Sequence, residues 1–334
     1  MSKIFLYPKP DKLLGTPNPY IKNFQEAILQ NHDLVNETAP NRGVLNLFLY
    51  FFRTEVYIFN WIEFLPEKRF GKLQSFGLVI LILLARLFGK KIIWILHNKN
   101  SHHKRKNIWT DSLFQLMMRS SHKIITHSNA GLDFVKSSFP KFSHKVDVII
   151  HPVSAMFDLT PVNEKAYDFI IWGTIFPYKG IDKFLKFLRE SPSKAKYKIL
   201  LVGKCFDENY KKTLEDLLTD NVVFYDQMFD LEMIAEFSNQ SKFTLFTYKS
   251  DTVISSGSLI DAIRMGSVII GPNHAAFKDL SSYSFLKTYN SFEEIFAIHD
   301  EYVPSSKLEK ERVDFCEANS WEIFMRKLEI IIKE

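Results

Sequence analysis

The stretch Thr244–Pro272, TLFTYKSDTVISSGSLIDAIRMGSVIIGP, predicts a strand, a polar loop, a helix and a second strand in close succession. The runs Thr244–Tyr248 and Ser267–Ile270 are rich in β-branched and aromatic residues, which favours strands. Between them, apolar residues recur at the spacing of a helix, which Gly266 is expected to end. A strand, loop, helix and strand in this order are typical of a ligand-binding α/β domain.

Small residues form the loop before this helix, namely Ser255, Ser256, Gly257 and Ser258. Their backbone N–H groups and the positive end of the helix can hold a phosphate group. Asp261, expected in the first turn, carries a carboxylate that can accept two hydrogen bonds from a diol such as a ribose. The pattern Ser258-x-x-Asp261 also fits a capping box, in which Asp261 satisfies a free backbone N–H. Taken alone, the stretch favours capping over ribose binding.

A second stretch, Asp168–Leu188 (DFIIWGTIFPYKGIDKFLKFL), has the same layout. It predicts a buried strand that ends at Gly173, then a loop with Lys179 and Gly180, then a helix capped by Asp182. Two such loops in one chain shift the balance towards ligand binding.

These motifs together resemble the nucleotide-sugar half of a GT-B glycosyltransferase, and glycosyltransferase family 4 in particular. The matching motifs are Trp172-Gly173, Lys179-Gly180, Gly203-Lys204 and the stretch from Ser255 to Pro272. The resemblance implies that the Gly173-Thr174 turn, Lys179 and Lys204 lie at the donor diphosphate. It also implies that the helix after Ser255 binds phosphate through its amides and ribose through Asp261.

The chain departs from the family pattern at two positions. Thr174 stands where the family commonly has arginine, and Val253 stands eight residues before Asp261, where the first acid of a Glu-x7-Glu pair is expected. These departures leave open which base and sugar the donor carries and whether the reaction retains or inverts configuration.

The resemblance implies an α/β protein with two Rossmann-like domains that face each other across a cleft. Residues 1–157 would bind the acceptor and residues 158–317 the nucleotide-sugar donor, with the Pro-marked segment 158–167 as the linker. The final helix, 318–334, would cross back to the first domain. Elsewhere in the second half, predicted strands and helices alternate, which favours a parallel sheet covered on both faces.

The first half places its chemical candidates after predicted strands. Glu63 follows the strand Val56–Trp61, and His97 follows the strand Ile92–Leu96, at the sheet edge where open α/β sheets bind ligands. His97 and His102 resemble histidines in the acceptor domain of enzymes similar to family 4. They could form part of a phosphate- or acceptor-binding loop, or serve in acid–base chemistry, to which imidazole is suited. A zinc site is not expected, because no nearby cysteine or acid completes a ligand set.

The first half of the chain is basic and contains the most apolar run, whereas the second half is acidic. Residues 1–152 have 21 Lys and Arg against 10 Asp and Glu (+11), and the remainder has 22 against 28 (−6). A basic first half favours contact with an anionic membrane over nucleic acid, for which no binding module is present. The apolar run Phe76–Phe88, between basic residues, fits a core helix or one that grazes a membrane, and is too short to span a bilayer.

Other features bear on the compartment. Cys205 and Cys316 lie far apart, so neither a disulfide framework nor a structural zinc site is indicated, and a reducing cytoplasm fits. The first ten residues predict a strand and not a signal peptide. We expect a cytoplasmic protein with peripheral contact on the inner face of the membrane.

The expected activity is transfer of a hexose from a UDP or GDP sugar to a glycan or lipid-linked acceptor, in bacterial surface-polysaccharide synthesis. Lys179, Lys204 and the amides around Ser256–Ser258 would stabilise the leaving diphosphate, so neither a metal nor another cofactor is required. Two alternatives stay open: a nucleotide-sugar 2-epimerase of the same fold, and a non-catalytic nucleotide-sugar-binding protein.

Overall fold

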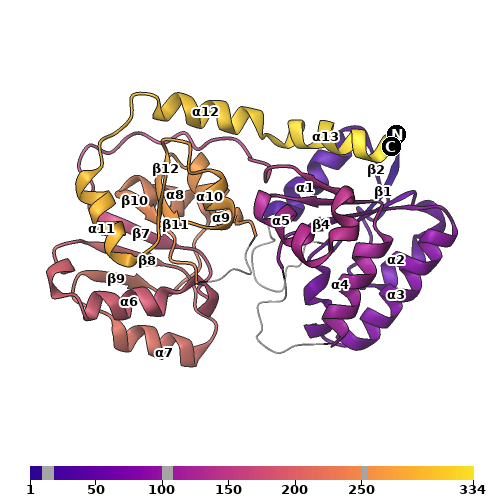
Figure 1. Cartoon of the computed structure of the whole chain (residues 1–334), viewed down its shortest axis with the longest axis horizontal. Coiled ribbons are helices and arrows are strands. Elements are labelled where there is room, and N and C mark those ends of the chain that lie inside the picture. Colours follow the sequence, from indigo (N-terminus) through magenta and orange to yellow (C-terminus); the bar gives the residue numbers. More distant parts are fainter. Residues whose placement is uncertain (10–18, 100–107, 250–253) are drawn as a thin grey trace. The chain divides into compact units, whose positions relative to one another are not determined.

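The chain divides into two compact units, shown as a computed structural model in Figure 1. The structure describes residues 1–9, 19–99, 108–249 and 254–334. Unit 1 comprises Met1–Pro152, Thr252–Ser255 and Asn319–Glu334, and unit 2 comprises Val153–Asp251 and Ser256–Ala318. The assignment of acceptor and donor roles to the two parts of the chain stays a prediction.

Unit 1 is built on a six-stranded parallel sheet with the order β2-β1-β3-β4-β5-β6. The strands are β1 (Lys3–Tyr7), β2 (Asp33–Leu34), β3 (Val56–Asn60), β4 (Lys91–Leu96), β5 (Lys123–Thr126) and β6 (Val146–Val148). The central strands are continuous runs of β-branched and aromatic residues, and β3 is buried along its whole length. Such runs are expected where helices cover both faces of a parallel sheet.

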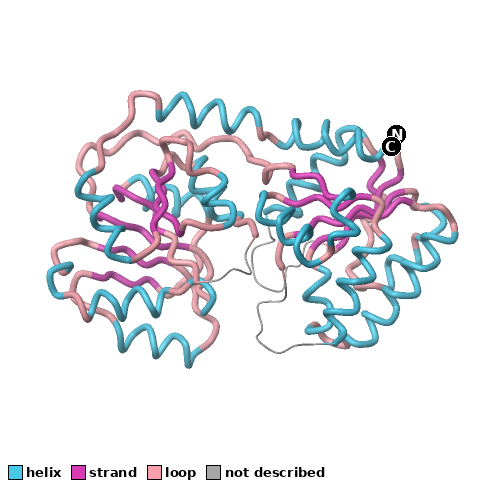
Figure 2. Tube along the Cα trace, in the orientation of Figure 1, coloured by secondary structure: helices cyan, strands magenta, loops and turns pink. Residues whose placement is uncertain are grey.

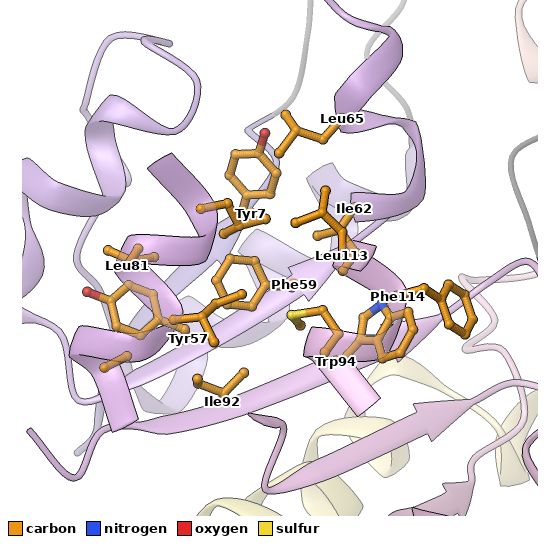
Figure 3. Packing of buried hydrophobic residues seen from close by; sticks show 14 of the residues in the cluster. Tyr7, Tyr57, Phe59, Ile62, Leu65, Leu81, Ile92, Trp94, Leu113 and Phe114 are labelled. Carbon is orange, nitrogen blue, oxygen red and sulfur yellow. The ribbon is translucent and has the colours of Figure 1, made fainter. Parts of the chain in front are cut away.

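Alternate residues of these strands enter two separate cores. Tyr57, Phe59 and Trp94 pack on one face with side chains of α3 (Gly71–Leu87) and α4 (Ile108–Ser120) (Figure 3). Ile58 and Ile93 pack on the other face with α1 (Pro19–Asn31) and α13 (Trp321–Lys333). The two shorter helices of unit 1 are α2 (Leu45–Leu49) and α5 (Asn129–Ser138).

The C-terminal helix belongs to unit 1, although unit 2 precedes it in the sequence. Phe324, Leu328 and Ile332 of α13 are buried in the same core as Phe24 and Ile28 of α1. The predicted return of the last helix to the first domain is therefore confirmed.

Unit 2 contains a second six-stranded parallel sheet, with the order β12-β11-β10-β7-β8-β9. The strands are β7 (Tyr167–Trp172), β8 (Ile199–Val202), β9 (Val222–Tyr225), β10 (Ser241–Leu245), β11 (Val268–Pro272) and β12 (Leu286–Tyr289). The helices are α6 (Ile181–Arg189), α7 (Glu208–Leu217), α8 (Leu231–Asn239), α9 (Gly257–Arg264), α10 (Ala275–Asp279), α11 (Phe292–Glu301) and α12 (Leu308–Ala318). Figure 2 shows the alternation of strands and helices that the sequence predicts.

In each sheet the strand order has one reversal point, where strands are added on one side first and on the other side later in the sequence. In unit 1 the sheet grows from β1 to β2 on one side and from β3 onwards on the other, and in unit 2 the equivalent point lies between β7 and β10. Ligands of open α/β sheets bind at the carboxyl ends of the strands that flank such a point. The topology therefore directs attention to the residues after β1 and β3 and to those after β7 and β10.

The longest apolar helix, α3, has 17 residues. Among the helices in the described ranges, none combines the length and hydropathy that crossing a bilayer requires.

Candidate functional site

The loops after β7 and β10 and the start of α9 meet at Gly173. A Cβ atom added to Gly173 would lie 3.0 Å from the Lys179 Nζ and 3.7 Å from the Ser258 Oγ. The ammonium group of one predicted motif and the hydroxyl of the other thus approach the same backbone position. Folding brings together residues that are about eighty positions apart in the sequence, at the reversal point of the unit 2 sheet.

The loop after β8 also closes on Gly173. Gly203 adopts φ 151°, and a Cβ atom there would come within 2.1 Å of the Gly173 carbonyl oxygen. Any side chain at this position would collide with backbone, so the glycine is required for the two loops to pack against each other. The Gly173 backbone therefore has the β8 loop against it and also lies close to the Lys179 ammonium.

Lys179 is a buried cation without a carboxylate partner in the described part of the chain. Its Nζ donates to the Trp172 carbonyl at 3.1 Å, and the Thr247 Oγ1 donates to the Lys179 carbonyl at 2.7 Å, which fixes the loop. Burial lowers the pKa of Lys179 to about 7. A buried cation with no counter-ion is costly, and an anionic ligand would remove that cost.

The N-terminus of α9 supplies the second anion-binding feature. Ser256 is the N-cap, since its Oγ accepts from the Leu259 N–H at 3.3 Å, and the Tyr248 hydroxyl lies 3.2 Å from the same Oγ. The structure describes no hydrogen bond from the backbone N–H of Gly257 or Ser258 in the residues that it covers. Free amides at a helix start attract a phosphate group.

The expected capping box does not form. Asp261 lies in the second turn of α9, and its Oδ1 accepts from the Arg264 Nε at 2.8 Å. The alternative role of Asp261 as a cap is therefore wrong, because Ser256 takes that position two residues before Ser258. Burial raises the pKa of Asp261, against the opposing effect of the Arg264 charge.

Lys204, also in the predicted donor set, already has a carboxylate partner. The Lys204 Nζ lies 3.0 Å from the Asp226 Oδ2, and the Lys211 Nζ lies 2.7 Å from the same oxygen. Lys204 is thus already neutralised, unlike Lys179. Thr174 is half-buried after Gly173, and Ser255 directly precedes the N-cap of α9.

In unit 1, His97 lies immediately after β4 in a buried aromatic environment. Its ring stacks on Trp61 at a centroid distance of 4.5 Å and meets the edge of Tyr20 at 5.1 Å. Burial lowers the pKa of His97 well below its usual value, and the nearby His127 and His151 lower it further. His97 is therefore neutral near pH 7.

Asn60, the last residue of β3, selects the tautomer of His97. The Asn60 Nδ2 donates to the Tyr7 carbonyl at 3.2 Å, so the Asn60 Oδ1 faces the His97 Nε2, 3.0 Å away. An amide oxygen only accepts hydrogen bonds, so the Nε2 of His97 carries the proton. The basic nitrogen of His97 is then Nδ1.

Glu63 lies in the 3-10 turn η2 (Ile62–Glu67), two residues after Trp61. It is buried, and its Oε1 accepts from the Asn98 Nδ2 at 3.1 Å. Its Oε2 has no hydrogen-bond partner within the described ranges. Burial raises the pKa of Glu63 to about 7, a value suited to a general acid or base at neutral pH.

His127, which lies beside His97, is hydrogen-bonded through both ring nitrogens. The His127 Nδ1 bonds to the Ile149 carbonyl at 2.8 Å and its Nε2 to the Tyr20 hydroxyl at 3.0 Å, and burial lowers its pKa to about 3. Among the described side chains, no three His, Cys, Asp or Glu residues are arranged to hold a metal ion. His102 lies outside the described residues.

Sequence reasoning missed Asn60 and Asn98 in unit 1 and Thr247 and Tyr248 in unit 2. Asn60 is a lone polar residue at the end of a buried strand, and Thr247 and Tyr248 lie at the end of the run that the sequence predicts as a strand. Their position at the carboxyl end of a strand marks them as candidates for a site. It does not reveal their hydrogen-bond partners, most of which lie far away in the sequence.

Comparison with solved structures establishes the fold. HepE of Anabaena, in complex with UDP and glucose, matches with a TM-score of 0.70 and 14% identity, over 100% of this chain and 99% of that one. A glycosyltransferase from Rickettsia africae matches with a TM-score of 0.65 and 13% identity, over 99% of this chain and 98% of that one. AviGT4, a glycosyltransferase involved in avilamycin A biosynthesis, matches with a TM-score of 0.65 and 12% identity, over 100% and 98%.

The chain therefore has the GT-B fold, as the sequence predicts. No protein-family model matches the chain, and no curated protein matches it by sequence.

Proposed function

We propose that the protein is a glycosyltransferase that moves a sugar from a nucleoside-diphosphate sugar to a glycan or lipid-linked acceptor. Unit 2 binds the donor and unit 1 the acceptor. The donor diphosphate lies at Gly173, between the Lys179 ammonium and the free amides of Gly257 and Ser258.

The observation that carries this proposal is the buried Lys179 without a carboxylate. A structural lysine at this depth would be expected to have an acid beside it, and even the more exposed Lys204 has Asp226. Lys179 instead has one carbonyl contact and lies near a helix start with free amides. A diphosphate supplies the missing charge, and the same contacts stabilise the leaving group as negative charge develops.

The complexes of HepE support this choice of ligand. That protein was solved with UDP and glucose and with UDP-glucose. We propose a UDP sugar as the donor, with Asp261 on the ribose through the carboxylate oxygen that Arg264 leaves free.

His97 is the proposed acceptor-side base, with Nδ1 as the accepting nitrogen, and Glu63 is the second candidate. Both follow strands whose carboxyl ends lie at or beside the reversal point of the unit 1 sheet. Burial lowers the pKa of His97 and raises the pKa of Glu63. Shifted pKa values of this kind are typical of groups that act in acid–base chemistry.

Ligand binding by the full chain tests the donor site. Titration calorimetry with UDP, GDP and their hexose conjugates should identify a nucleotide that binds wild type. Lys179→Ala should weaken binding by about ten- to hundredfold, as removal of a buried charge-assisted contact does. The matched variant Lys204→Ala should lose less nucleotide affinity, because Asp226 already neutralises the Lys204 side chain.

The product distinguishes the enzyme from its alternatives. NMR of the sugar after incubation with donor should show transfer to an oligosaccharide or slow release by water. A change of configuration at C2 of the sugar, with no transfer, would identify an epimerase instead. Nucleotide binding with neither reaction would leave a non-catalytic binding protein, and no binding of any nucleotide would remove the donor site itself.

A further inference from the structure

The outward face of α3 is apolar. Leu73, Phe76, Ile80, Leu83 and Leu87 recur at alternating steps of three and four residues and are all exposed, with Leu73, Leu83 and Leu87 at 71%, 56% and 78%. We call these five residues the outer stripe. The opposite face, which includes Leu78, Leu81 and Ile82, is buried in the unit 1 core. Figure 3 shows Leu81 among the residues of this core. An exposed face would normally be polar on an amphipathic helix of a globular domain.

The apolar surface extends beyond α3. Phe88 follows the stripe and is 56% exposed, and its ring lies 6.2 Å from that of Phe52, which is 85% exposed. The neighbouring helix α2 packs on α3 at Gly77 and exposes Leu45 and Leu49. Contiguous exposed apolar patches of this kind mark interaction sites.

Basic side chains lie at both ends of the stripe. Lys68, Arg69 and Lys72 precede it, Arg86 lies in the last turn, and Arg53 follows Phe52. None of the five forms an ion pair with a carboxylate among the described residues. Between residues 52 and 91 the sequence has seven basic and three acidic residues, and one of the acids, Glu63, is buried.

We propose that the outer stripe of α3 docks unit 1 on an anionic lipid surface. The helix lies in the plane of the membrane, with the leucines and phenylalanines in the headgroup and acyl boundary and the basic residues on anionic headgroups. The inserted part is the exposed side chains of the stripe, four of which lie in a run of thirteen consecutive uncharged residues, 73–85.

A second copy of the chain fits the stripe less well than a membrane does. In a symmetric dimer the same patch would face itself, whichever way the two α3 helices ran. Both ends of the stripe are basic, so basic groups would meet basic groups across the interface and repel. An anionic bilayer matches both the apolar and the charged parts of the surface.

Sedimentation of the full chain with vesicles tests the proposal without measuring any enzyme activity. Vesicles of phosphatidylcholine with phosphatidylglycerol should carry the protein into the pellet at low salt, and phosphatidylcholine alone should bind it much less. Raising the salt should release it, since the attraction of exposed charges is screened. The double variant Phe76→Gln/Leu83→Gln should bind about tenfold or more weakly, and Lys72→Gln about fivefold more weakly.

Matched variants on α13 of the same unit serve as controls. Ile330→Gln replaces a side chain that is 62% exposed, and Lys327→Gln removes an exposed charge. Both should bind vesicles as wild type does, and all variants should keep the wild-type melting temperature because each altered side chain is exposed.

Three results would overturn the proposal. These are the absence of pelleting at low salt, equal loss of binding in the control and stripe variants, and self-association. In the last case, analytical ultracentrifugation would show a wild-type dimer that Phe76→Gln/Leu83→Gln dissociates, which would assign the stripe to a second copy.

Discussion

At the scale of single residues, burial of Lys179 links ligand binding to pH. The pKa falls from 10.5 for an ordinary lysine to about 7 in the folded protein. Between these values the unfolded chain holds a proton that the folded chain lacks, so the free energy of unfolding contributed by Lys179 rises with pH. Below pH 7 both states are charged, and the folded state carries the whole cost of the buried cation.

We predict that Lys179→Met raises the melting temperature of the ligand-free protein, most strongly below pH 7, while it weakens nucleotide binding. Bound diphosphate should also draw a proton onto Lys179 at pH 8. Calorimetry in two buffers of different ionisation enthalpy would measure that uptake. Wild-type proton uptake in Lys179→Met, or a lower melting temperature, would contradict this account.

His97 and Glu63 predict different pH profiles for turnover. The pKa of His97 lies well below 6.5, so a His97 base is already active at pH 6.5 and above. The pKa of Glu63 is about 7, so a Glu63 base would give turnover that rises through that pH.

We expect His97→Ala to reduce turnover most, by about 10²- to 10⁴-fold, with donor affinity changed much less. Steady-state kinetics on His97→Ala and Glu63→Gln, with the product anomer assigned by NMR, provide the measurement. A limb near pH 7 that disappears in Glu63→Gln, together with an inverted product, would move the base to Glu63.

At the scale of elements, the start of α9 allows a direct test of which serine caps it. Ser256→Ala should lower the free energy of unfolding by about 1 kcal/mol, because the Leu259 N–H loses its acceptor. Ser258→Ala, the matched change two residues later, should leave stability nearly unchanged and weaken nucleotide binding. Urea denaturation of both variants decides between them, and the reverse order of stabilities would restore the capping box.

The same helix shows where prediction from sequence stops. Strands such as β3 and β4 could be located because buried parallel strands are continuous apolar runs. The N-cap of α9 could not, because Ser255, Ser256 and Ser258 are all suitable caps locally. The Tyr248 hydroxyl contacts Ser256, and that contact depends on the tertiary fold.

For the site residues too, local sequence indicates the residue but not the partners that the tertiary fold brings to it. A loop motif predicts Lys179 as a site residue, and the fold adds that it has no acid partner within the described residues. A similar motif predicts Lys204, yet Asp226, which directly follows β9, lies beside it. The bond between Asn60 and His97 joins positions 37 apart in the sequence, and no local pattern indicates it.

At the scale of the whole molecule, α13 should control the stability of unit 1 alone. Leu328 of α13 is fully buried in the unit 1 core. Leu328→Ala should therefore lower the free energy of unfolding of unit 1 by about 2 to 5 kcal/mol. Hydrogen exchange should then quicken in β1 and β3 and stay unchanged in β7 and β8. Ile330→Ala, on the exposed side of the same helix, is the control, and equal acceleration in both sheets would show that the units do not unfold separately.

Because α13 completes a core of unit 1, that core cannot close during synthesis until the last helix has emerged. When the strands of unit 1 have emerged, the apolar side chains of α1 that α13 covers, such as Phe24 and Ile28, are still without their partner. They stay uncovered while all of unit 2 is translated, so unit 2 can complete its core first although its sequence comes second. A nascent chain halted before Asn319 therefore presents an incomplete first core to chaperones, and the last helix acts as the final step of assembly.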